Sequence, residues 1–104
     1  DLPFDVELWQ SVLMRLNTHR GGYWANPNLG SRFHLMRRSK DVARNRLIAK
    51  QYADEALRDL MPARVAAITT TVSQLEKGRI NLKIEITRLT GDKQSIIYFV
   101  KVGG

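Results

Sequence analysis

The spacing of apolar residues changes once along the chain, close to Pro62. Before this residue, apolar positions recur every three or four residues. After it, they alternate with polar positions. The longer period predicts amphipathic helices, and the period of two predicts strands with one buried face. We therefore expect helices in the first sixty residues and strands in the last forty.

A first helix is predicted over Val6–Asn17, because its apolar positions form a single stripe at helical spacing. The stripe consists of Leu8, Trp9, Val12, Leu13 and Leu16. Asp5 is a suitable N-cap, since its carboxylate can accept an N–H from the open first turn. The helix is expected to end before Gly21 and Gly22, which adopt positive φ at little cost.

A second helix is predicted over Val42–Met61, with Asp41 as its N-cap. It has a broad apolar face with small residues that allow close packing, and a charged row on the opposite side. The charged row consists of Arg46, Lys50, Asp54 and Arg58. Pro62 should end the helix, since proline disfavours helical geometry at the residue before it.

The two helices are joined by a long segment that includes Asn26–Leu35. A connection of this length is uncommon in a compact domain unless it is functional or anchored. Because it contains large apolar residues, we expect it to pack against the core. These residues are Tyr23, Trp24, Phe33 and Leu35. The part from Phe33 to Arg38 fits either one helical turn or a short strand.

Three strands are predicted, over Val65–Leu75, Ile80–Thr87 and Ser95–Val102. The turns at Gly78 and Gly91 are short, which requires antiparallel neighbours. The predicted fold is one α+β domain over residues 1–104, with two helices packed on one face of a small antiparallel three-stranded sheet. The order of elements is helix, loop, helix, then three strands.

Composition narrows the possible functions. The chain has no cysteine, which excludes disulfides, thiolate metal sites and cysteine catalysis. No apolar run is long enough to span a bilayer, and no signal peptide is visible. The net charge of +7 is concentrated in a basic stretch between Arg20 and Lys50, in which only Asp41 is acidic. This charge favours an acidic partner, either a nucleic acid or a protein surface.

The sequence gives no positive sign of catalysis. Glu55 and Asp59 could in principle flank a sugar, but both lie on the charged side of the second helix and fit a solvated face better. His19 and His34 are fifteen positions apart and lack a metal-ligand spacing. We therefore expect no enzyme activity, no metal and no cofactor.

Two binding hypotheses remain. The basic residues near Arg38, with aromatic residues upstream, are compatible with nucleic-acid binding, although no recognition motif is present. The last strand supports protein interaction, since Ile96–Val100 is apolar on both faces. Either a partner covers one of these faces or docks a strand beside it, or the domain itself covers both.

The element order resembles that of baseplate wedge proteins from contractile phage tails, closest to the branch found in Mu-like phages. This family includes the wedge component of T-even phages once labelled a lysozyme. The similarity includes the amphipathic segment Leu8–Leu16, the turn Thr18–Trp24, the segment Leu29–Leu35 with the basic residues that follow it, and Tyr52–Leu57. It ends with a strand starting near Val65 and a hairpin at Gly78.

One departure from the family concerns a Glu-Pro-Arg triplet that the T-even branch carries between the long helix and the sheet. This chain has Met61-Pro62-Ala63-Arg64 there, so the glutamate is missing and the arginine is displaced by one position. The resemblance implies a structural, non-enzymatic protein in the six-fold baseplate wedge of the virion, made in the host cytoplasm. Its expected partners are other wedge proteins and sheath proteins, without a membrane.

The residues expected to contact these partners fall into two sets. The last strand is the expected docking edge, and the basic residues supply an electrostatic contact. The set comprises Arg37, Arg38, Lys40, Arg44, Arg64, Ile97, Phe99 and Lys101. The alternative hypothesis is a small basic nucleic-acid-binding α+β domain.

Overall fold

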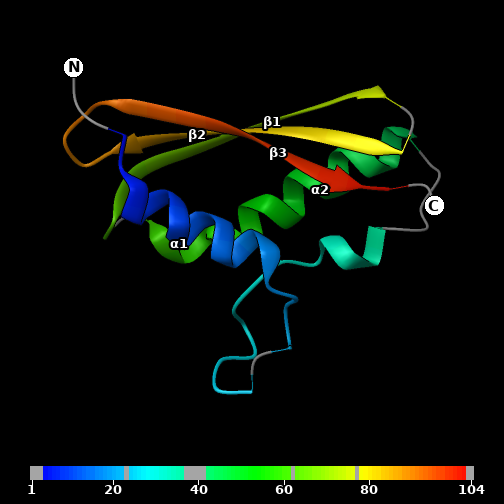
Figure 1. Cartoon of the computed structure of the whole chain (residues 1–104), viewed down its shortest axis with the longest axis horizontal. Coiled ribbons are helices and arrows are strands. Elements are labelled where there is room, and N and C mark those ends of the chain that lie inside the picture. The colour runs from blue at the N-terminus through cyan, green and yellow to red at the C-terminus, as the bar shows by residue number, and fades with distance from the viewer. Residues whose placement is uncertain (1–3, 23, 37–41, 62, 77, 103–104) are drawn as a thin grey trace.

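The computed structural model describes residues 4–22, 24–36, 42–61, 63–76 and 78–102, without the side chains at 42, 43 and 74–76. Two helices lie against one face of a three-stranded sheet (Figure 1). The elements are α1 (Val6–Asn17), η1 (Phe33–Met36), α2 (Val42–Leu57), η2 (Arg58–Leu60), β1 (Val65–Glu76), β2 (Arg79–Arg88) and β3 (Lys93–Lys101). The predicted α+β class and element order are confirmed.

Helix α1 has the predicted bounds because its cap and its apolar stripe agree. The Asp5 carboxylate accepts the Leu8 N–H at 3.0 Å, which satisfies one of the open donors of the first turn. At the other end, the Thr18 N–H donates to the Met14 carbonyl. Four members of the stripe are buried against the sheet: Leu8, Trp9, Val12 and Leu16.

Helix α2 is shorter than predicted. The α-helix ends at Leu57 and tightens into the 3₁₀ turn Arg58–Leu60, while Met61 is extended, as expected before a proline. The predicted N-cap Asp41 lies outside the described residues. Ala49 and Ala53 are completely buried, which lets the α2 backbone lie close to the sheet.

The sheet is an antiparallel meander in the order β1-β2-β3. Ile84 in the central strand pairs with Thr70 of β1 and with Ile96 of β3. All three strands lie where they were predicted, within two residues at each end. The inward row of β2 forms the centre of the core and is fully buried: Ile80, Leu82, Ile84 and Ile86.

The expectation that the long loop packs down is confirmed only at its end. Phe33 is buried, and the residues from it to Met36 form a helical turn, not a strand. In contrast, Trp24 is 91% exposed and Leu35 is 60% exposed, so the expectation is wrong for both. The part of the loop that contains Trp24 projects beyond the helices (Figure 1). Tyr23 lies outside the described residues.

Candidate assembly surface

The two faces of β3 have different surroundings. Ile96, Tyr98 and Val100 point toward α1 and η1 and are buried or half-buried. Ile97 and Phe99 point to the opposite face of the sheet and are 53% and 55% exposed. The hypothesis that the domain covers both faces of the last strand is therefore wrong, because the described elements cover only the inner one.

Strand β3 is an edge of the sheet. The residues of β3 whose side chains point to the outer face also direct their backbone N–H and C=O groups away from β2, to the unpaired side of the strand. Hydrogen bonds Arg88 N–H to Asp92 O (2.8 Å) and Val102 N–H to Gly78 O (3.0 Å) mark the two ends of the β2–β3 ladder. Bonded and non-bonded pairs alternate in an antiparallel ladder. The alternation assigns the N–H and C=O groups of Ser95, Ile97 and Phe99 to the free edge.

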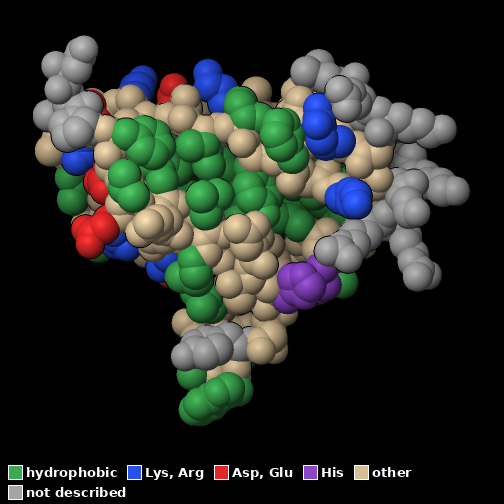
Figure 2. Space-filling view, in the orientation of Figure 1, with side chains coloured by type: hydrophobic (Ala, Val, Ile, Leu, Met, Phe, Trp, Pro, Cys, Tyr) green, Lys and Arg blue, Asp and Glu red, His purple; other side chains and the backbone are tan. Residues whose placement is uncertain are grey.

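Helix α1 borders the first part of this edge with apolar and polar contacts to β3. Trp9 donates its indole N–H to the Gln94 side chain at 3.0 Å, and Phe4 stacks on Trp9 with ring centroids 5.7 Å apart. Leu13, one helical turn after Trp9, is 37% exposed. Figure 2 shows a band of hydrophobic side chains on this side of the molecule.

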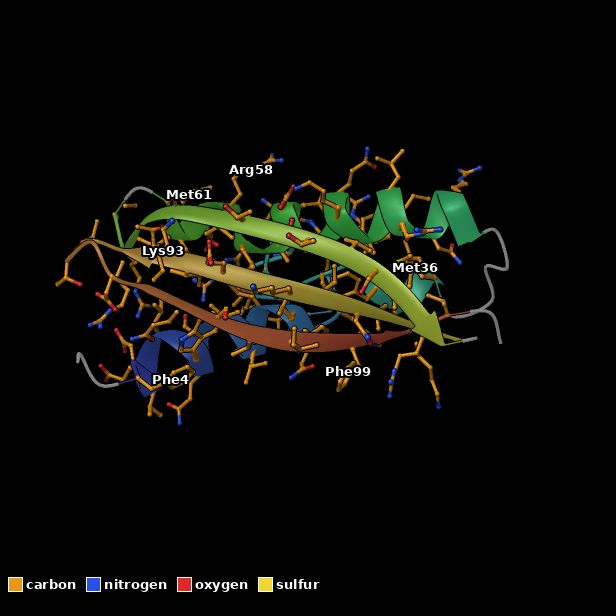
Figure 3. All side chains as sticks on the ribbon, turned by 90° about the horizontal axis from the view of Figure 1, so that it is seen from above. Phe4, Met36, Arg58, Met61, Lys93 and Phe99 are labelled. Carbon is orange, nitrogen blue, oxygen red and sulfur yellow. The ribbon has the colours of Figure 1, made fainter. Side chains whose placement is uncertain are left out.

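Cationic side chains lie on the outer face beside Ile97 and Phe99. The Arg79 guanidinium lies 4.5 Å from the centroid of the Phe99 ring, a cation–π arrangement. Lys101 pairs in register with Arg79, and Lys83 pairs with Ile97. Phe99 projects from the sheet beyond β3 when the molecule is seen from above (Figure 3). An apolar pair of side chains is thus framed by cationic ones.

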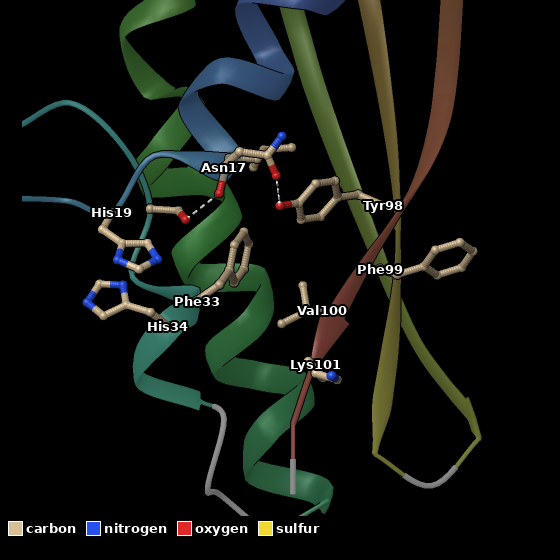
Figure 4. Close-up of a pocket in the computed structure, with 10 residues that line it drawn as sticks. Asn17, His19, Phe33, His34, Tyr98, Phe99, Val100 and Lys101 are labelled. Atoms are coloured by element: carbon tan, nitrogen blue, oxygen red, sulfur yellow. Dashed lines mark hydrogen bonds between the residues drawn. The ribbon is translucent and has the colours of Figure 1, made fainter. Parts of the chain in front are cut away.

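A hollow of about 220 Å³ opens beside the second half of β3, between the end of α1 and η1 (Figure 4). Tyr98 donates its hydroxyl to the Asn17 side chain there, and burial raises the pKa of the Tyr98 phenol. His19 and His34 stack with centroids 4.3 Å apart. Their spacing in the sequence did not predict this contact. An isolated β-bridge between His19 and Ser31 brings the two segments side by side.

The predicted basic contacts do not form one cluster among the described residues. Arg37, Arg38 and Lys40 lie outside that part of the chain. Arg44 is exposed at the start of α2, which lies at the end of the sheet where β3 ends (Figure 1).

Arg64 directly precedes β1, at the opposite end of the sheet, and donates to the Ser11 hydroxyl at 3.1 Å. Ile97, Phe99 and Lys101 do share one outward row of β3. The structure therefore brings the strand residues together and places Arg64 away from Arg44.

The two carboxylates considered for catalysis are held by arginines. Glu55 lies 3.0 Å from Arg32 and 3.8 Å from Arg20, and Asp59 lies 3.0 Å from Arg15. These pairs connect the loop to α2 and α1 to η2. Within the described ranges, no group of three or more potential metal ligands occurs, and no described helix is long and apolar enough to cross a membrane.

Taken together, these observations describe a small α+β protein whose last strand is an edge of the sheet with exposed apolar side chains. The model of the family described as Phage protein GP46 matches residues 7–93, and the chain belongs to this family. No curated protein matches the chain.

The fold is also that of a solved structure, a candidate tail lysozyme from Geobacter sulfurreducens. That protein is 22% identical, with a TM-score of 0.75 over 98% of this chain and 96% of the other. Family and fold agree with the resemblance to phage tail baseplate proteins.

Proposed function

We propose that the chain is a structural component of a contractile phage tail baseplate, acting by protein–protein assembly and helping to seed the sheath. The family, the fold shared with a candidate tail lysozyme and the open β3 edge support this proposal. The β3 edge is the observation that supports the proposal most strongly. Ile97 and Phe99 are large, apolar and about half exposed on a strand whose backbone is available to a neighbour.

The docking mode that fits this edge is strand addition. An extended segment of a neighbour would bond the outward backbone groups of Ser95, Ile97 and Phe99. Its side chains on the outer face would contact Ile97 and Phe99, and those on the inner side would contact the flank of α1 near Leu13. Main-chain bonds give such a contact its affinity, and the flanking side chains give it specificity.

The β3 edge is a better docking strand than the β1 edge. Helix α2 runs along most of β1, whereas α1 accompanies only the first part of β3 (Figures 1 and 3). On the β1 side, Thr70 is buried and bonds Lys50 and Asp54 of α2. A strand arriving there would meet charged side chains, while one arriving at the second half of β3 would meet Phe99.

The basic residues would supply the electrostatic part of the contact. Arg37, Arg38, Lys40 and Arg44 are proposed to face acidic surfaces of wedge or sheath proteins, with Arg64 meeting a neighbour at the other end of the sheet. Lys101 borders the docking row itself. In the virion this arrangement would be repeated six times around the tail tube, after synthesis in the host cytoplasm.

This role requires no catalysis. The name of the Geobacter structure contains the word lysozyme, but Glu55 and Asp59 here each form an ion pair with arginine. A glycosidase needs one carboxyl group with a raised pKa beside a second, ionised one in the same cleft. The two carboxylates here are instead held in ion pairs on two different elements, Glu55 on α2 and Asp59 on η2.

The proposal is tested by tail assembly in the phage or prophage that encodes the chain, with its own copy deleted. Ile97→Pro removes an N–H that faces the open edge, and proline is tolerated at such positions of edge strands. Ile97→Lys places a charge in the same contact. Both variants should fold, and both should reduce the yield of complete tails at least tenfold.

Tyr98→Pro is the matched control, because the Tyr98 N–H belongs to the β2–β3 ladder and its loss should unfold the hairpin. Circular dichroism separates this outcome from a docking defect. Normal tail yield with both folded Ile97 variants would overturn the docking proposal. Tails that lack the chain altogether would overturn the baseplate assignment.

A further inference from the structure

The loop from Gly21 to Gly30, which we term the finger loop, extends away from the helices (Figure 1). Its ten residues include no charged side chain, although 26% of the whole chain is charged. Trp24 within it is 91% exposed, and Ala25 is exposed beside it. An exposed tryptophan on an uncharged loop contrasts with the basic surface elsewhere.

The base of the finger loop is fixed to the end of α1. The Arg20 N–H donates to the Ser31 carbonyl and the Ser31 N–H donates to the Thr18 carbonyl, each at 2.8 Å. The Ser31 side chain is buried and donates to the Leu16 carbonyl at 2.7 Å. These three bonds hold the two ends of the loop side by side.

Two further features stiffen the finger loop. Arg32, just beyond it, pairs with Glu55 of α2 at 3.0 Å. Within it, the Asn26 side chain accepts the Asn28 N–H at 3.1 Å, an Asx turn, and the Leu29 N–H donates to the Asn26 carbonyl. A loop held in this way loses little conformational freedom when its tip is buried by a partner.

We propose that the finger loop is a second assembly contact, in which Trp24 inserts into an uncharged apolar pocket on a different protein of the tail. Tryptophan is prominent among residues that dominate binding energy, because it buries a large area with few rotatable bonds. The absence of charge fits the desolvated centre of a protein interface, which is depleted in charged residues.

The other possible occupants fit less well. Four hollows of the described surface each include a charged or imidazole side chain, such as Lys101, Glu55, Asp54 and Arg32. None of these four hollows would give Trp24 of a second copy an uncharged pocket. A nucleic acid would need cations on the finger loop for its phosphates, and the loop has none.

The test rests on the proposed function, because it uses assembled tails. The chain has no cysteine, so Ala25→Cys introduces a single thiol beside Trp24. Its rate of reaction with a maleimide is measured in the isolated protein and in purified tails that contain the variant. Burial of the finger loop in the assembled tail should slow the reaction at least tenfold.

The contribution of Trp24 is measured as incorporation into tails. Trp24→Ala should reduce it about thirtyfold, the ratio expected from the loss of a central interface residue. Trp24→Phe should restore part of it, and Trp24→Lys should restore none. Incorporation of Trp24→Ala at the wild-type level, or an unchanged thiol rate in tails, would overturn this inference and leave the baseplate assignment intact.

Two further measurements use the isolated protein labelled at Ala25→Cys with an environment-sensitive dye. A blue shift on addition of phosphatidylcholine–phosphatidylglycerol vesicles would identify a lipid surface as the occupant. A blue shift that grows with protein concentration would identify a second copy. Either shift would overturn the proposal, which expects neither. If the chain is absent from tails, the proposed function fails instead.

Discussion

At Gly30 the backbone leaves no room for a side chain. A Cβ built there would lie 2.4 Å from the Thr18 carbonyl oxygen, and φ is +107°, a conformation that other residues adopt at a cost. This close approach follows from the bonds that Ser31 makes to Thr18 and Leu16. Gly30 is therefore the residue that allows the base of the finger loop to close.

Gly30→Ala should destabilise the protein by about 2–4 kcal/mol, because the clash with backbone adds to the cost of positive φ. Gly21→Ala is the matched control. Its φ is +87°, but nothing lies within 4 Å of the added Cβ, so its cost should be only about 1 kcal/mol. Urea unfolding of both variants measures the difference, and equal losses would contradict the account of Gly30.

At the same scale, sequence reasoning succeeded where one residue and its neighbours decide the outcome. Asp5 was predicted as an N-cap from its position before an apolar stripe, and the structure confirms it. The exposure of Trp24 was not predictable in this way. Whether an aromatic residue packs depends on which distant surface lies within its reach, and the sequence pattern contains no such information.

At the scale of elements, the turn between β2 and β3 depends on Asp92. Its carboxylate accepts hydrogen bonds from the Thr90 hydroxyl and from Arg88 and Gln94, the last two at 3.2 and 3.3 Å. The Thr90 hydrogen bond is the largest cause of a lowered pKa of Asp92, and Arg88 adds to it. The ionised carboxylate therefore favours the folded hairpin.

Because the pKa of Asp92 is lower in the folded chain than its ordinary value of 3.8, its stabilisation is fully present above that value. The stabilisation is lost as the pH falls through the folded pKa. Asp92→Asn should therefore reduce the loss of stability in acid, measured by urea unfolding between about pH 2 and pH 6. The same acid dependence in both proteins would refute this role.

Thr90→Ala tests the role of Asp92 in a second way, because it keeps the Asp92 carboxylate and removes its main hydrogen-bond donor. An NMR titration should then show the pKa of Asp92 closer to 3.8 than in the wild type.

The helices and strands were predictable as elements because each has a clear apolar period, although their ends were less certain. Helix α2 loses its last turn to a 3₁₀ conformation, and β1 contains an irregularity between Val65 and Ala67. The apolar outer side of β3 was visible in the sequence. Its exposure was not, because that depends on whether the long loop covers the outer face, and the sequence pattern does not place that loop.

At the scale of the molecule, charge and apolar surface occupy the same region. Lys101 and Arg79 frame Phe99, and the start of α2 with Arg44 lies at the same end of the sheet. The two hypotheses drawn from the sequence, nucleic-acid binding and protein assembly, use this region differently. Phosphate contacts would use only the cations, whereas strand addition also uses Ile97 and Phe99.

Salt distinguishes these uses. Binding to DNA through several cations should weaken about a thousandfold between 50 and 200 mM salt, because each contact releases counterions. Docking through main-chain bonds and apolar side chains should retain most of its affinity over this range, with the cations affecting mainly the rate of association. We therefore expect incorporation of the isolated chain into tails lacking it to persist at 200 mM salt.

The nucleic-acid hypothesis requires a generic DNA duplex to bind at low salt and to be released as the salt concentration rises. Fluorescence anisotropy of a labelled duplex measures this binding. The comparison with Phe99→Ala shows whether the apolar side chain contributes to it. Tight DNA binding that is unaffected by Phe99→Ala and lost at higher salt would favour the nucleic-acid hypothesis. Loss of tail incorporation by Phe99→Ala at every salt concentration would favour assembly, since that substitution changes no charge.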